Sequence, residues 1–112
     1  MQLLIIVLNK VECLDKLLKR FGDEHIPGAT ILDSKGMAME LGEIDELRFL
    51  GSLRKMLNPE HHESKTIFMV IDEKRIPEVS AIVNEVTGGL SSPDTGIMFS
   101  LAVNYTEGLG NK

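Results

Sequence analysis

Two runs of the sequence are apolar almost without interruption, and they constrain the fold more than any other feature. Residues 3–8 read LLIIVL and residues 66–71 read TIFMVI. A strand that faces solvent on one side alternates apolar and polar residues, whereas uninterrupted apolar runs are typical of strands covered on both faces. In a single domain of 112 residues, these two runs are expected to form the centre of one sheet.

The residues between and after these runs predict two further strands and a helix. Residues 29–34 and 97–103 predict the strands, and the second of them alternates cleanly along its length. Apolar residues recur at helical spacing after the first run, where Asn9 is the expected N-cap and Gly22 the expected end of the helix. One face of this helix is apolar and the other is charged, which is typical of a helix packed on a sheet.

A second helix follows the second apolar run. Asp72 is its expected N-cap, Pro77 falls in or near its first turn, and Gly88 and Gly89 end it. The order is therefore strand, helix, strand, strand, helix, strand. Two strand–helix–strand units with right-handed crossovers predict an α+β, ferredoxin-like domain, with a four-stranded antiparallel sheet and both helices on one face.

Such a sheet leaves its second face uncovered. The central strands would expose leucine and isoleucine there, which a soluble monomer rarely tolerates. Self-association through this open face is therefore expected. Ile5 and Ile6 must point to opposite faces, but the sequence does not decide which of them faces the helices.

The connection between the second and third strands, residues 37–64, is far longer than connections in compact domains usually are. Gly51 interrupts an otherwise amphipathic helical pattern in its middle. This pattern fits either a helix packed on the neighbouring core or a protruding arm that folds on a ligand or partner. Its apolar positions are Ile44, Leu47, Leu50, Leu53 and Leu57.

Composition excludes several classes of partner. A net charge of −5 argues against nucleic acid, because neutralising phosphates requires a basic face. The single cysteine, Cys13, cannot form an internal disulfide, which favours a reducing, cytoplasmic location. The first apolar run is too short to insert into a membrane, and it lacks the basic start of a signal peptide.

The residues that could carry catalysis or bind a metal are few. The sequence EHHE at 60–63 offers His61 and His62 as weak candidate metal ligands. Adjacent histidines point in different directions, so a solvated polar end of the arm is the favoured interpretation. No nucleophile–base–acid order, paired-carboxylate motif or Walker loop is present in the sequence, and the chain is not expected to be an enzyme.

Three stretches resemble the PII-like signalling proteins: GATILDSKGM at 28–37, VTGG at 86–89 and GIMFSLAV at 96–103. The predicted order of strands and helices is similar over most of the chain. That family consists of trimeric ferredoxin-like domains in which a long T-loop joins the second and third strands. The resemblance implies that 37–64 is a T-loop that signals to a target such as a transporter or enzyme. It also implies a homotrimer with the open sheet face buried at its centre.

Family members hold adenine nucleotides in clefts between subunits, through the start of the T-loop, a glycine loop after the second helix and a basic C-terminal segment. The resemblance therefore implies a small-molecule effector in such a cleft. The implied ligand-binding residues are Thr30, Lys35, Gly36, Met37, Ala38, Gly88, Gly89, Ser91, Ser92 and Gly96. Target contacts in the long connection are expected from Leu47, Phe49, Leu50, Leu53 and Arg54.

The charges expected for a triphosphate are absent from the matching positions. The family's phosphate-binding lysine falls on Ile97, and the chain ends in TEGLGNK instead of a basic segment. Three phosphates need fixed cations or a nest of backbone donors. Conventional Mg-ATP binding is therefore expected to be weak or absent, and a mono- or diphosphate or a carboxylate fits better. The identity of the effector stays open.

Two alternatives belong to other functional classes. A CutA-type divalent-cation-tolerance protein shares the trimeric ferredoxin-like fold, and this alternative depends on His61, His62 and Glu63 as ligands. The other alternative is a purely structural module that oligomerises.

Overall fold

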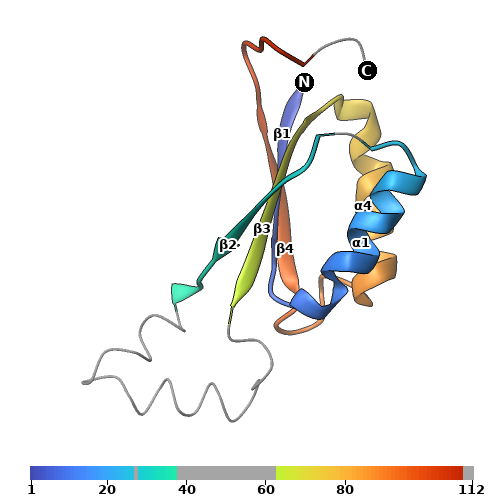
Figure 1. The fold of residues 1–112 in the computed structure, drawn as a ribbon, viewed down its shortest axis with the longest axis vertical. Helices are drawn as coiled ribbons and strands as arrows, with labels where there is room; N and C mark the ends of the chain where they lie inside the picture. Colours follow the sequence, from blue (N-terminus) through green and yellow to red (C-terminus); the bar gives the residue numbers. More distant parts are fainter. Residues whose placement is uncertain (27, 38–62, 110–112) are drawn as a thin grey trace.

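The computed structural model describes residues 1–26, 28–37 and 63–109. These residues form a four-stranded sheet with two α-helices, in the chain order predicted from the sequence (Figure 1). The elements are β1 (Gln2–Leu8), η1 (Val11–Cys13), α1 (Leu14–Asp23), β2 (Thr30–Ser34), β3 (Ser64–Ile71), η3 (Glu73–Arg75), α4 (Ile76–Thr87) and β4 (Gly96–Ala102).

The strands lie in the order β2-β3-β1-β4, and every neighbouring pair is antiparallel. Helices α1 and α4 lie side by side on the same face of the sheet (Figure 1). The two apolar runs form the central strands β1 and β3, so the predicted α+β, ferredoxin-like fold is confirmed. Among the described residues, no helix is both long and apolar enough to cross a membrane.

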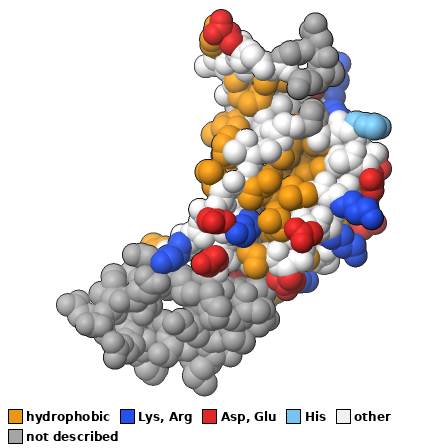
Figure 2. Space-filling model, viewed as in Figure 1, with side chains coloured by type: hydrophobic (Ala, Val, Ile, Leu, Met, Phe, Trp, Pro, Cys, Tyr) orange, Lys and Arg blue, Asp and Glu red, His pale blue; other side chains and the backbone are white. Residues whose placement is uncertain are grey.

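The face of the sheet away from the helices is apolar, as predicted. Figure 2 shows hydrophobic side chains along the margin of the sheet opposite the helices. Three rows of paired residues cross β4, β1 and β3 on this face: Leu101–Leu3–Val70, Phe99–Ile5–Phe68 and Ile97–Val7–Thr66. The exposed fractions of the β4 side chains in these rows are 53% for Leu101, 44% for Phe99 and 59% for Ile97. Edge strand β4 therefore carries most of the exposed apolar surface of the three rows. This open face is defined here by the three rows together with Thr30 and Leu32 of β2.

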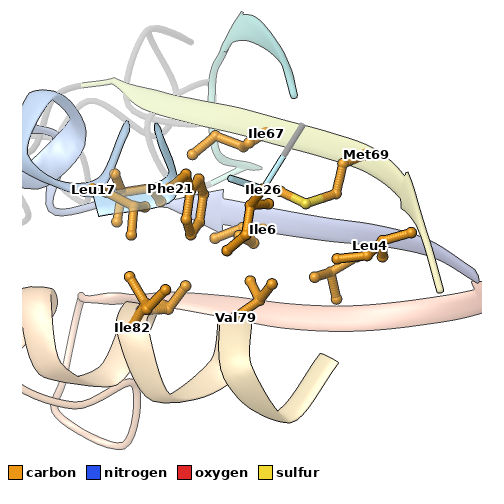
Figure 3. Packing of buried hydrophobic residues seen from close by; sticks show 12 residues of the cluster. Leu4, Ile6, Leu17, Phe21, Ile26, Ile67, Met69, Val79 and Ile82 are labelled. Atoms are coloured by element: carbon orange, nitrogen blue, oxygen red, sulfur yellow. The ribbon is translucent and has the colours of Figure 1, made fainter. Parts of the chain in front are cut away.

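The core lies between the other face of the sheet and the two helices (Figure 3). Ile6 is fully buried there, which assigns it to the helix side and leaves its neighbour Ile5 on the open face. The described core consists of Leu4, Ile6, Leu8, Leu17, Phe21, Ile26, Ile67, Met69, Ile71, Val79, Ile82 and Val83.

Three predicted helix boundaries are wrong. Asn9 is not the N-cap of the first helix, because the 3-10 turn η1 begins at Val11 after Lys10 and α1 begins at Leu14 after Cys13. Gly22 does not end the first helix, since α1 continues to Asp23. The second helix ends as predicted, but Asp72 caps the 3-10 turn η3, and α4 itself begins at Ile76 after Arg75. The Asp72 carboxylate accepts from the Lys74 N–H at 2.9 Å, and Gly88 ends α4 with a φ of +86°.

Candidate ligand-binding site

The predicted ligand residues of the second strand lie along the β2 edge of the sheet. Thr30 is exposed at the start of β2, where it pairs with Phe68 of β3. Lys35 and Gly36 follow the other end of the strand and are exposed, and Met37 is 77% exposed. This edge therefore presents the predicted residues to solvent, with Thr30 a full strand length away from Gly36.

The glycine loop, residues 88–95 between α4 and β4, is held by side chains from the last turns of α4. Thr87 is buried, and its hydroxyl donates to the Val83 carbonyl at 2.8 Å while accepting from the Gly89 N–H at 3.3 Å. The amide oxygen of Asn84 accepts from the Leu90 N–H at 2.8 Å. These contacts shape the loop from within.

The same contacts correct the expectation that the glycine loop offers a row of free donors. The Gly88 N–H donates to the Asn84 carbonyl at 3.1 Å, and the Ser92 N–H donates to the Gly89 carbonyl at 3.1 Å. Together with Gly89 and Leu90, four of the five backbone N–H groups in 88–92 donate within the protein. An anion at this loop must therefore be held mainly by side chains, and Ser91 and Ser92 are exposed there.

Lys10 is a cation beside the loop that sequence reasoning missed. Its ammonium donates to the Thr87 carbonyl at 3.0 Å, and a side chain at Gly88 would meet it at 3.9 Å. An ammonium has three donors, so this contact leaves Lys10 two others. The pairing of Leu8 with Gly96 brings the start of the β1–α1 connection next to the end of the α4–β4 loop. A sequence-based topology could have found Lys10 through this pairing.

Gly96 joins the glycine loop to β4, and a glycine is needed there because the backbone of Val7 lies too close for a side chain. Its φ is +153°, and a Cβ atom there would lie 2.5 Å from the Val7 carbonyl oxygen. Ile97, at the position of the family's lysine, points instead to the open face beside Val7. A lysine at Ile97 would thus place its charge on the apolar face.

The two groups of predicted ligand residues lie at opposite edges of the sheet. Thr30, Lys35 and Gly36 belong to the β2 edge, whereas the glycine loop leads into β4 at the other edge. Two strands lie between them, so the edges are roughly 14 Å apart at about 4.8 Å per strand spacing. Within one chain these groups cannot bind the same small ligand. They can do so only if neighbouring subunits bring a β2 edge and a β4 edge together.

One hollow in the described part lies beside β3, next to the start of β2. Its volume is about 480 Å³, and Thr30, Phe68 and Leu109 are among its lining residues. The β2–β3 ladder ends at the Thr30–Phe68 pair, so β3 runs on without β2 along this hollow. Arg75 at its rim is held by other contacts: it donates to the carbonyls of Glu24 at 2.9 Å and His25 at 3.1 Å. The hollow is therefore mainly apolar, with backbone groups along one wall.

The base of the long connection is closed by polar contacts between β2 and β3. The hydroxyls of Ser34 and Ser64 lie 2.7 Å apart, and Thr66 donates to Ser34 at 2.8 Å. Lys65 forms an ion pair with Asp33, and this hydrogen bond raises the pKa of Lys65 above its ordinary value. Lys65 is therefore committed to Asp33 in this structure.

Several predicted residues lie outside the described part. These are Ala38 of the ligand set, the target contacts Leu47, Phe49, Leu50, Leu53 and Arg54, and the metal candidates His61 and His62. Within residues 1–26, 28–37 and 63–109, no group of three or more His, Cys, Asp or Glu side chains is placed to hold a metal ion.

Comparisons with known proteins show the fold and no more. No family model matches the chain, and no curated protein matches it. Among solved structures, 113 chains match. One is described as "The crystal structure of a functionally unknown protein from Pediococcus pentosaceus ATCC 25745", with a TM-score of 0.64 and 18% identity over 95% of this chain and 94% of that one. Because one fold supports many functions, this similarity supports the architecture alone.

Proposed function

We propose that this chain is a PII-like sensor that binds a small ligand between subunits of a homotrimer and signals to a target protein through residues 37–64. One observation carries the proposal: the predicted ligand residues lie at opposite edges of a sheet whose open face is apolar. A neighbouring subunit would cover that face and bring a β2 edge to a glycine loop in the same step.

The charges of the described residues favour a ligand with one or two phosphates, or a carboxylate, over a triphosphate. Lys10 is a cation beside the glycine loop, where its ammonium donates to the Thr87 carbonyl. Most backbone N–H groups of residues 88–92 already donate within the protein. One ammonium and a few hydroxyls suit a small anionic group better than three adjacent phosphates.

In this mechanism the ligand acts by shifting a population. It binds more tightly when residues 37–64 adopt the conformation that the target recognises, so binding raises the fraction of chains in that conformation. The ligand's differential affinity sets the limit of this shift.

The test combines mass and binding. Light scattering should give roughly three times the chain mass of 12.4 kDa, and calorimetry should detect AMP or ADP more strongly than ATP. A monomer at micromolar concentration refutes the proposal. Binding of divalent metals without any nucleotide favours the CutA-type alternative, and a trimer that binds neither favours a structural module.

Lys10 gives the matched mutational test. Lys10→Met should weaken binding of AMP, by about tenfold for the loss of a charged hydrogen bond. Lys74→Met is the control, because Lys74 is exposed in η3, the 3-10 turn before α4. Equal AMP affinity of the two variants would remove Lys10 from the site.

A further inference from the structure

Both ends of the glycine loop meet at one residue, Lys10, which lies between β1 and η1. The Lys10 ammonium donates to the Thr87 carbonyl at 3.0 Å, and Thr87 is the last residue of α4. The backbone N–H of Lys10 donates to the Thr95 carbonyl at 3.1 Å, and Thr95 is the last residue before β4. Lys10 therefore holds the residue that precedes the loop and the residue that ends it.

The bond to Thr87 stabilises the end of α4. An α-helix leaves its last carbonyls without partners inside the helix. A lysine ammonium near this end satisfies such a carbonyl and interacts favourably with the helix dipole. Thr87 is only 1% exposed, so water has little access to the site of this bond. Losing the ammonium would therefore leave a carbonyl poorly satisfied, which is costly.

The backbone of Lys10 is fixed independently of its ammonium. Its carbonyl accepts from the Cys13 N–H at 3.0 Å within η1, while its N–H donates to Thr95. The Cys13 thiol lies 3.6 Å from the Val86 carbonyl, so the same connection contacts the end of α4 a second time. A substitution that removes only the ammonium should therefore leave this connection in place.

The bonds inside the glycine loop are local. The Leu90 N–H donates to the side chain of Asn84, six residues earlier, and the Ser92 N–H donates to the Gly89 carbonyl. Such bonds shape the loop but do not attach it to the sheet. Lys10 provides an attachment, because it follows the end of β1 and lies 77 residues from Thr87 in the chain.

We infer that Lys10 is a positioning residue that sets the shape of the glycine loop before any ligand binds. Its importance for binding rests on the function proposed above, in which the same ammonium contacts the ligand. An ammonium has three N–H groups, so one can hold Thr87 while another meets an anion. A loop that is already shaped lowers the cost of ordering the site when the ligand arrives.

Amide exchange and backbone order parameters, both measured without ligand, test this inference. In Lys10→Met, the amides of Leu90 and Ser92 should exchange about tenfold faster, because opening the loop no longer breaks a charged hydrogen bond. Their order parameters should fall from about 0.85, typical of rigid backbone, toward about 0.6. Lys10→Arg keeps a charged donor and should restore much of both, and Lys74→Met is the control for loss of a lysine elsewhere.

Two outcomes would overturn the inference. One is unchanged exchange of Leu90 and Ser92 in Lys10→Met relative to Lys74→Met. The other is faster exchange throughout the chain with unchanged order parameters in the loop, because this would show that Lys10 contributes to overall stability alone. Neither measurement uses a ligand. A wild-type protein that fails to bind AMP in calorimetry would therefore count against the proposed function and leave the role of Lys10 in the loop standing.

Discussion

Ile5 and Ile6 are adjacent in β1, yet an aspartate should have different consequences at the two positions. Ile6 is fully buried against the helices. Ile6→Asp forfeits about 2–3 kcal/mol of apolar burial and adds the cost of an unpaired buried charge, several kcal/mol more. Small domains are stabilised by only about 5–15 kcal/mol, so this variant should be unfolded at any concentration. Ile5 lies on the open face between Phe99 and Phe68, where a carboxylate in the monomer keeps contact with water.

Ile5→Asp should therefore fold as a monomer. Circular dichroism should give the wild-type spectrum, and light scattering should give 12.4 kDa, whereas the proposed wild-type trimer should give roughly three times that mass. Ile5→Val retains an apolar side chain and should assemble normally, which separates the charge from any effect of side-chain shape. If Ile5→Asp keeps the mass of the wild type, the open face is not the interface and the reasoning from its apolar surface fails.

Two further substitutions, Gly96→Ala and Thr87→Val, test the loop before β4, and each has a control. Gly96→Ala should destabilise the fold by about 2 kcal/mol in urea unfolding, because its Cβ would lie 2.5 Å from the Val7 carbonyl oxygen. Gly22→Ala, where a Cβ meets no atom within 4 Å, should be neutral or stabilise the fold by up to about 1 kcal/mol. Thr87→Val removes the acceptor of the Gly89 N–H and should cost about 1–2 kcal/mol, whereas Thr87→Ser, which keeps the hydroxyl, should recover much of the loss.

The sheet was predictable because its central strands must be buried. Runs that are apolar almost without interruption were expected in the two central strands, and the observed strand order confirms this for β1 and β3. The start of β3 was predicted too late, at residue 66 instead of Ser64. Ser64 and Lys65 are polar, and they belong to the strand because Ser34 and Asp33 across the ladder pair with them. Hydrophobic periodicity contains no signal for such polar pairs.

The prediction that the backbone N–H groups of the glycine loop are free was wrong for a reason visible in the sequence. A sequence of glycines and serines suggests free backbone donors, but Asn84 and Thr87 precede it in the last turn of α4. Short polar side chains at a helix end compete for nearby backbone groups, and here they accept from Leu90 and Gly89. That signal was present in the sequence. Lys10 is different, because it reaches the loop only through tertiary pairing of the strands.

In the proposed function, the topology links ligand binding to assembly. The residues that resemble a nucleotide site are divided between the β2 and β4 edges, which are separated by the width of the sheet. A site that uses both edges exists only in the oligomer, so a ligand that binds there must also stabilise the oligomer by mass action. Under the proposed function, covering the apolar open face is also the step that completes the site. By the same linkage, dilution that separates the subunits must abolish binding, and saturating ligand must lower the concentration at which the subunits separate.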